Sequence, residues 1–261
     1  MDIAFNDLVR RIEKRVSEPV NVMEIGPLTY AVDLSAYNLI VYYYLPGSVR
    51  FHSADISVKK YIHLDEDIWL NKSDLVLNRI LNKIGQARRV AARSGVVARV
   101  DKKTTIAFLE EHHLHSPIPG KYRYGLFVDG ELMSIAVFSG GRLMRHTDAY
   151  RSFECIRFCT KQGYVVVGGL SKLLKAFSRD FQPSDVMTYV DLDWSDGRLY
   201  EKLGFENAGL TEPQHYLVDR ENHQRIIYKA GVTSSSVLEK NQNCYVVANS
   251  GSLKMIKRYF V

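Results

Sequence analysis

The stretch YVVVGGLSKLLKAF, residues 164–177, constrains the fold most, because an apolar run ends at two glycines and passes directly into an amphipathic helix. Leu173, Leu174 and Phe177 share one face of that helix, and the following apolar run at 185–192 has the composition of a strand. Segments of this kind predict a sheet that is covered by helices.

The patterns around this stretch alternate between strands and helices. Asp129-Gly130 joins two apolar runs and favours a hairpin, because both residues tolerate positive φ. The predicted elements follow the order β-α-β-β-β-α-β-α-β-β over 96–100, 103–113, 122–128, 131–139, 153–159, 170–181, 185–192, 197–204, 215–219 and 225–230. This order predicts an α/β (α+β) fold with a mixed sheet flanked by helices.

A smaller α/β unit precedes this pattern. Strands are predicted at 29–34, 38–45 and 59–64, followed by a helix from about Asn71 that ends at Gly85. We therefore divide the chain into a small domain, residues 1–90, and a larger domain, residues 91–261.

Composition favours a cytoplasmic protein that does not enter membranes. The chain has 261 residues, of which 46% are hydrophobic, and this is enough to form a core without disulfide or metal crosslinks. Its three cysteines do not form a disulfide framework, and no apolar segment approaches ~20 residues.

The net charge of +6 makes an anionic partner plausible. Basic residues cluster at 10–15, 86–103 and 252–260, and acidic residues concentrate at 63–67 and 191–196. The second basic cluster contains Arg88, Arg89 and Arg93, which form either a nucleic-acid surface or an ordinary solvated face.

The double glycine is the first candidate site. Glycines let a backbone approach a ligand closely, and the free amides around Gly168, Gly169, Leu170, Ser171 and Lys172 would attract an anion. The side chains of Ser171 and Lys172 would add a hydroxyl and a charge. Alternatively, the glycines only form a tight turn between strand and helix.

The second candidate site follows the strand at 185–192. Asp191 and Asp193 lie two residues apart, so an extended chain places them on one face, as a general base or metal ligand requires. Alternatively, they cap the next helix or pair with basic loops. Tyr200 in that helix either reaches a gap between strands or belongs to the core.

Two further patterns contain polar groups. In FECIRFC, strand alternation puts Cys155, Arg157 and Cys159 on one face, and a buried Arg157 needs an anion, either a structural partner such as Glu131 or Asp191 or a ligand. A cysteine nucleophile is disfavoured, because no histidine is adjacent in the sequence. The histidines in LEEHHLH, His112, His113 and His115, lack metal-ligand spacing and predict a surface loop near the site.

Segment 96–230, with its hairpin, its glycine-led helix and LYEKLGF, resembles the GCN5-related N-acetyltransferase (GNAT) superfamily. The resemblance implies that Gly168, Gly169 and Ser171 bind the phosphates of an acyl donor and that Tyr200 is the general acid. The usual Gln/Arg-x-x-Gly-x-Gly/Ala loop is replaced here by VVVGGLS.

A narrower likeness is to phage and mobile-element proteins, including Mom-type DNA-modifying acyltransferases. It rests on three groups of residues: Glu154, Arg157 and Phe158; Tyr189 with Asp191; and Gly197, Tyr200 and Phe205. The upstream unit looks like a very-short-patch-repair endonuclease fold, in which Asp33 matches one catalytic carboxylate. Tyrosines follow where further acidic residues are expected, which indicates lost cleavage.

These features lead to one main hypothesis and two alternatives. The first is a GNAT-like acyltransferase that uses acetyl-coenzyme A or another acyl donor and modifies a nucleic-acid base or another amine. In it, Arg157 and Asp191 orient or deprotonate the acceptor, and DNA is a possible partner. The alternatives are a non-catalytic DNA-binding protein built on degenerate enzyme folds, and a metal-dependent nuclease.

Overall fold

The computed structural model describes residues 2–51, 60–144, 147, 149–228 and 243–259. The chain forms two compact units, and both are interrupted in sequence. The first unit contains residues 1–84, 191–196 and 210–252, and the second contains 85–190, 197–209 and 253–261. The sequence predicts one division near residue 90, and in the structure two later segments also belong with the first unit.

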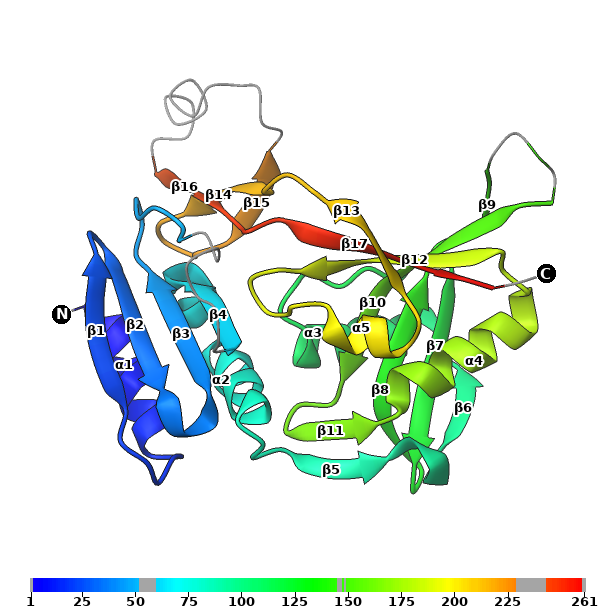
Figure 1. Cartoon of the computed structure of the whole chain (residues 1–261), viewed down its shortest axis with the longest axis horizontal. Coiled ribbons are helices and arrows are strands. Elements are labelled where there is room, and N and C mark those ends of the chain that lie inside the picture. Colours follow the sequence, from blue (N-terminus) through cyan, green and yellow to red (C-terminus); the bar gives the residue numbers. More distant parts are fainter. Residues whose placement is uncertain (1, 52–59, 145–146, 148, 229–242, 260–261) are drawn as a thin grey trace. The chain divides into compact units, whose positions relative to one another are not determined.

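A four-stranded sheet is the centre of the first unit. Its strands, in spatial order, are β1 (Asn21–Gly26), β2 (Thr29–Leu34), β3 (Leu39–Tyr44) and β4 (Lys60–Asp65), antiparallel except for the parallel β3–β4 pair. Helices α1 (Ile3–Glu13) and α2 (Glu66–Lys83) lie side by side against it (Figure 1). The buried ring of Phe5 in α1 stacks on Tyr30 and contacts Tyr43, which fixes α1 on this face.

Helix α2 begins earlier than the predicted start near Asn71. Its first residue is Glu66, and Lys72 departs from helical geometry with φ −140° and ψ 40°. The predicted start therefore falls at a kink within a longer helix. Gly85 follows the helix with φ +88°, a conformation that favours glycine. This agrees with the prediction that the helix ends at Gly85.

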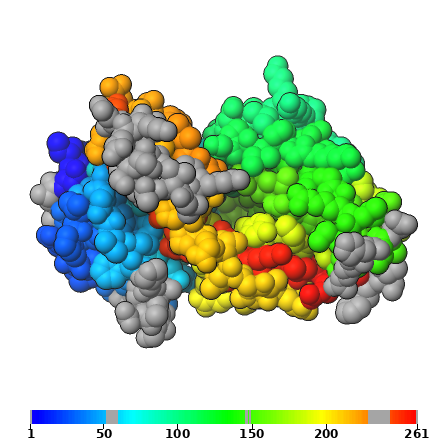
Figure 2. Space-filling view, turned by 90° about the horizontal axis from the view of Figure 1, so that it is seen from above, coloured from blue at the N-terminus to red at the C-terminus, as the bar shows by residue number. Residues whose placement is uncertain are grey.

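A three-stranded antiparallel sheet completes the first unit. Its strands, in spatial order, are β15 (Arg225–Tyr228), β14 (His215–Asp219) and β16 (Cys244–Ala248). The predicted pairing of β14 with β15 is confirmed, but the prediction that this pair belongs to the mixed sheet is wrong. Arg225 instead forms ion pairs with Asp65 and Asp67, which hold β15 beside β4 and α2. Figure 2 shows residues of this region, in orange, next to the blue and cyan residues of the N-terminal segment.

An eight-stranded mixed sheet is the centre of the second unit, as predicted for the fold class. Its spatial order is β13-β17-β12-β10-β8-β7-β6, with β9 paired beside β10. These strands span Glu206–Leu210 (β13), Ser252–Arg258 (β17), Asp185–Asp191 (β12), Arg151–Thr160 (β10), Glu131–Phe138 (β8), Tyr122–Val128 (β7), Val96–Arg99 (β6) and Arg142–Leu143 (β9). The β7–β8 hairpin turns at Asp129 and Gly130, whose φ angles of 50° and 79° confirm the predicted turn.

Helices cover both faces of this sheet (Figure 1). On one face, α4 (Gly169–Phe181) buries Leu173 and stacks Phe177 on Phe138, with ring centroids 3.8 Å apart. On the other face, α3 (Lys102–His112) packs Phe108 and Leu109 against β8 and β10. A separate two-stranded parallel ribbon, β5 (Arg88–Ala91) with β11 (Tyr164–Val167), leads into α4.

Candidate functional site

The central feature of the second unit is a separation between two parallel neighbours. Strands β10 and β12 pair through Ser152 with Asp185, Phe153 with Val186, and Glu154 with Met187. Both strands continue beyond the last pair, to Thr160 and Asp191, but no further pair joins these two fully described strands. The two strands therefore stop pairing in the middle of the sheet, after Glu154 and Met187.

A β-bulge lies where the strands separate. The register of β10 against β8 shifts between Cys155 and Arg157, which breaks the alternation of side chains. Cys155 consequently packs in the core under α4, whereas Cys159 packs under α3. The prediction that Cys155, Arg157 and Cys159 share one face is therefore wrong, because a bulge reverses the face for the residues that follow it.

The Cys155 thiol is unsuited to nucleophilic attack. Burial raises the pKa of Cys155 to about 12, so the thiol stays protonated at neutral pH. Its neighbour Arg157 lies opposite Val137 on the α3 face, and its guanidinium donates to the carbonyls of Ile156 (2.9 Å) and Ser116 (3.5 Å). One predicted structural partner of Arg157, Glu131, forms an ion pair with Lys161.

The start of α4 provides uncapped backbone amides. Gly168 precedes the helix with φ +80°, and no side chain of the described residues caps this end. The amides of Gly169, Leu170 and Ser171 belong to the first turn, where a helix offers them no carbonyl partner. A Cβ on Gly169 would lie 3.2 Å from Val166 Cγ1, so this glycine also permits a tight turn. Both interpretations of the double glycine thus have support.

The ammonium group of Lys172 is bound by the protein itself. Its Nζ atom donates to the carbonyl oxygens of Ala92 (2.9 Å) and Gly95 (2.5 Å) and lies 3.4 Å from that of Arg93. These carbonyls belong to the short 3-10 helix at 92–94 and its end. Lys172 thus ties α4 to this turn, and the exposed Arg93 comes close to the first turn of α4.

Tyr200 belongs to the same core as α4. It lies in the short helix α5 (Arg198–Lys202), which begins after Gly197 with φ +80°. Its ring packs edge to face on Phe205, with centroids 5.5 Å apart, against the core cluster that contains Leu170. Tyr200 is half-buried, so its position is not sealed from solvent.

Asp191 is the last residue of β12. It belongs to the first unit, whereas Arg157, Tyr200 and the start of α4 belong to the second. Its Oδ1 atom accepts the amide of Asp193 (3.0 Å), and its carbonyl accepts the amides of Trp194 and Ser195. Asp191 therefore stabilises the turn that ends β12.

The histidines His112 and His113 do not lie in the exposed surface loop that the sequence predicts. His112 lies in the last turn of α3, and both His112 and His113 are buried. His112 contacts Phe108 edge to face at 4.5 Å, and burial lowers the pKa of His112. The observed helix matches the predicted helix at 103–113 in length, but its last turn packs against the protein interior, which buries His112.

The N-terminal unit contains Asp33, the carboxylate that the resemblance to an endonuclease singled out. Asp33 on β2 accepts a 2.8 Å hydrogen bond from Ser35 and lies opposite Ile40. Along β3, the hydroxyl of Tyr44 instead bonds with His63 Nδ1 at 2.7 Å. In the part of the chain that the structure describes, no group of three or more His, Cys, Asp and Glu side chains is arranged to hold a metal.

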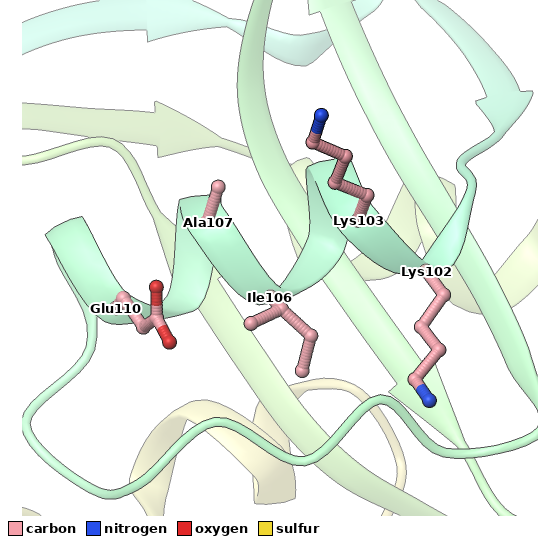
Figure 3. A pocket seen from close by; sticks show the side chains of 5 residues that line it. All are labelled: Lys102, Lys103, Ile106, Ala107 and Glu110. Carbon is pink, nitrogen blue, oxygen red and sulfur yellow. The ribbon is translucent and has the colours of Figure 1, made fainter.

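Other candidate surfaces are exposed. Arg88, Arg89 and Arg93 are all exposed on the β5 ribbon and the turn that follows it. A separate shallow cavity of about 520 Å³ runs along the outer side of α3 (Figure 3). It is lined by Lys102, Lys103, Ile106, Ala107 and Glu110, none of which was predicted as a site residue.

The structure also reveals residues that the sequence did not single out. Arg50 and Arg225 bind the buried carboxylates of Asp65, Asp67 and Asp193 in the first unit. The acidic runs 63–67 and 191–196 were visible in the sequence. Their arginine partners were not, because Arg225 lies 160 residues from Asp65 and Arg50 lies 143 residues from Asp193 along the chain.

Comparisons with known proteins found likenesses in structure alone. No family model matches the sequence, and neither does any curated protein. The ribosomal-protein-S18-alanine N-acetyltransferase from Escherichia coli is 10% identical, with a TM-score of 0.41 over 64% of this chain and 95% of that chain. A GNAT family acetyltransferase from Elizabethkingia anophelis with acetyl-CoA bound is 11% identical, with a TM-score of 0.34 over 64% of this chain and 99% of that one.

A Bacillus subtilis acetyltransferase in complex with CoA is 12% identical, with a TM-score of 0.35 over 64% of this chain and 99% of that one. Similarities this distant carry no argument about function.

None of the helices in the described ranges is long and apolar enough to cross a membrane.

Proposed function

We propose that the second unit transfers an acyl group from a thioester donor, such as acetyl-coenzyme A, to an amine. The observation that carries the proposal is the separation of β10 and β12 beyond Glu154 and Met187. Where parallel strands stop pairing, their facing amides and carbonyls can bind an extended ligand in the way a sheet edge binds a peptide. Acetyl-coenzyme A carries two amides on the flexible arm between its thioester and its phosphates.

The start of α4 suits the phosphates of such a donor. The amides of Gly169, Leu170 and Ser171 offer donors to an anion, and the absent side chain of Gly168 allows close approach. Lys172 is engaged with backbone carbonyls, so the nearby exposed Arg93 is the better candidate for a cationic contact. We therefore assign the phosphates to these amides with Arg93.

Tyr200 is the proposed proton donor. In the transfer, the amine nitrogen forms a bond to the thioester carbonyl carbon, and the bond from that carbon to sulfur breaks. The departing thiolate takes the phenol proton of Tyr200, the amine nitrogen releases its proton to solvent, and the phenolate regains a proton from solvent. Backbone amides at the diverging strand ends would stabilise the tetrahedral oxyanion. The acceptor roles of Asp191 and Arg157 stay predictions from the sequence.

A direct test is equilibrium binding of acetyl-coenzyme A to the full chain. Ser171→Glu puts a carboxylate among the first-turn amides of α4 and should weaken binding at least about tenfold by repelling the phosphates. Ser178→Glu makes the same change in the last turn of the same helix and should leave the affinity within about twofold. Equal effects of the two variants, or no binding by the wild type, would contradict the assigned donor site.

A nucleic-acid base is the proposed acceptor, in keeping with the resemblance to phage Mom-type enzymes. Arg88, Arg89 and Arg93 are clustered in sequence and exposed, which also favours the alternative of a DNA-binding protein without catalysis. Replacing all three by Gln should weaken duplex DNA binding and flatten its salt dependence, because fewer counterions are released. Replacing the exposed Lys14 and Arg15 by Gln is the control and should change neither.

A further inference from the structure

Three buried carboxyl groups of the first unit share two guanidinium groups. Arg50 donates to Asp65 at 2.8 and 3.1 Å and to Asp193 at 2.9 Å. Arg225 donates to Asp65 at 2.7 Å and to Asp67 at 2.5 and 2.8 Å. This cluster joins the segment after β3, β4, the first turn of α2, the turn after β12 and β15.

The cluster is nearly closed to water. The side chains of Asp65, Asp67 and Asp193 are 5%, 1% and 4% exposed, and those of Arg50 and Arg225 are 13% and 19% exposed. With all five groups ionised, one negative charge has no counter-charge within the cluster. An uncompensated buried charge is costly, so the fold favours neutralising one carboxyl group.

Asp193 is the carboxyl group with the weakest compensation. Asp65 contacts both arginines and Asp67 forms two bonds to Arg225, whereas Asp193 receives one bond from Arg50 and one from the amide of Ser250 (3.0 Å). Burial raises the pKa of Asp193 to about 7 against the attraction of Arg50, and the charges of Asp191 and Asp65 raise it further. Burial also raises the pKa of Asp67 against the attraction of Arg225, whereas the two arginines hold the pKa of Asp65 below its ordinary value despite its burial.

The other polar groups around Asp193 do not change this assignment. Tyr44 from β3 and Tyr216 from β14 are near enough to feel its charge, but burial raises the pKa of both phenols, so they stay neutral. The amide of His63 on β4 donates to the Asp193 carbonyl at 2.9 Å. The hydroxyl of Ser250 is near enough to interact with the Asp193 carboxylate, and this interaction lowers the pKa of Asp193 against the larger effect of burial.

We propose that this cluster is a pH-sensitive clamp, which holds the 191–196 turn most firmly when Asp193 carries a proton and loosens when Asp193 ionises. Through Arg225, the same cluster anchors β15 to β4 and α2. The clamp belongs to the first unit and is independent of the acyl transfer proposed for the second. Its titration lies near neutral pH, where small changes of acidity alter its charge.

The sign of the effect follows from proton linkage. Because the pKa of Asp193 is higher in the folded chain than in the unfolded chain, the folded state binds the proton more tightly. The stability that this provides is fully present below the ordinary aspartate pKa and is lost as pH rises through about 7. Between these limits, one linked proton lowers the equilibrium constant for folding about tenfold per pH unit.

Any test must distinguish the titration of Glu66 from the titration of Asp193. Burial and the charge of Asp2 raise the pKa of Glu66 to about 7, so it titrates in the same range with the same sign. Chemical unfolding of the full chain is therefore measured from pH 5.5 to 8 for the wild type, Asp193→Asn, Glu66→Gln and the double variant. Asp193→Asn should remove about one linked proton and Glu66→Gln another. An Asp193→Asn variant with the pH dependence of the wild type overturns the proposal.

Carboxyl titration of the wild type provides a second test that needs no variant to fold. With carbon-13 introduced only at aspartate carboxyl groups, the signal assigned to Asp193 through its backbone amide should titrate near pH 7, and Glu66 is silent. Hydrogen exchange, corrected for its intrinsic pH dependence, should show protection of the amides of Ser250 and Asp193 falling over the same range. Aspartate signals that all titrate below about pH 5, or protection that stays constant, would overturn the clamp.

Discussion

The hydroxyl of Thr188 donates a 2.9 Å hydrogen bond to the carbonyl oxygen of Cys155, at the bulge where β10 and β12 stop pairing. Both residues are buried, so this carbonyl has no water to replace a lost partner. A side chain here substitutes for the missing strand bond. Thr188 thus stabilises this bulge.

Replacing Thr188 by Val should therefore destabilise the protein by about 1–3 kcal/mol, because the shape is kept while a buried carbonyl loses its donor. Denaturant unfolding measures the change. Thr188→Ser keeps the hydroxyl and should recover most of the loss. A Val variant as stable as the wild type would show that this carbonyl has another partner.

Gly168 offers a test of the corner before α4. Its φ of +80° is a left-handed conformation that costs a residue with a Cβ about 1 kcal/mol or more. Gly168→Ala should lower stability by this amount, whereas Gly168→Asn should lower it less, because Asn tolerates this region. The nearest atom to an added Cβ, Ala92 Cβ, is 3.8 Å away, so crowding does not explain the loss. Equal stability of Ala and Asn variants would point to a cause other than backbone conformation.

Local patterns predicted much of the second unit. The Asp129-Gly130 turn, the strands beside it and α4 follow from side-chain periodicity and turn chemistry within short windows. The bulge at Cys155 was not predictable, because it depends on pairing with β8 and on Thr188, which lies 33 residues away. Periodicity alone predicts that Cys155 and Cys159 share one face of the sheet, whereas the bulge places them in different core clusters.

Contacts between residues far apart in the sequence also determine the surroundings of Arg225 and Lys172. Arg225 was predicted in a strand, but its buried partners Asp65 and Asp67 lie about 160 residues earlier, so local patterns could not show that β15 joins the first unit. Lys172 was expected beside an anion, because a lysine in the first turn of a helix suggests one. In the structure, backbone carbonyls brought close by β6 and the turn before it bind its ammonium group.

Lys172 therefore distinguishes a structural role from a ligand contact. Lys172→Met removes the donor for the carbonyls of Ala92 and Gly95 and should destabilise the protein by about 1–3 kcal/mol. Because this ammonium does not contact the donor in our proposal, affinity for acetyl-coenzyme A should change less than about threefold, apart from unfolding. Thermal unfolding and calorimetric binding give the two values. Weaker binding with unchanged stability would instead return Lys172 to the phosphate site.

Tyr200→Phe tests the chemistry itself. The ring that packs edge to face on Phe205 is kept, so unfolding should change by less than about 1 kcal/mol, while the proton donor is lost. If Tyr200 protonates the thiolate, kcat for acyl transfer should fall about 10²–10⁴-fold with little change in donor affinity. Release of free thiol from acetyl-coenzyme A, with candidate amines or duplex DNA as acceptor, measures the rate.

The matched control is Tyr189→Phe, which removes a hydroxyl from a tyrosine that is 43% exposed on β12 of the same unit. Its kcat should stay within about threefold of the wild type, because the proposed reaction does not use the phenol of Tyr189 as a proton donor. A Tyr200 variant with full activity would exclude the Tyr200 phenol as the acid, and the proposed reaction would then need another proton donor. Full loss in both variants would instead indicate that both phenols position the acceptor.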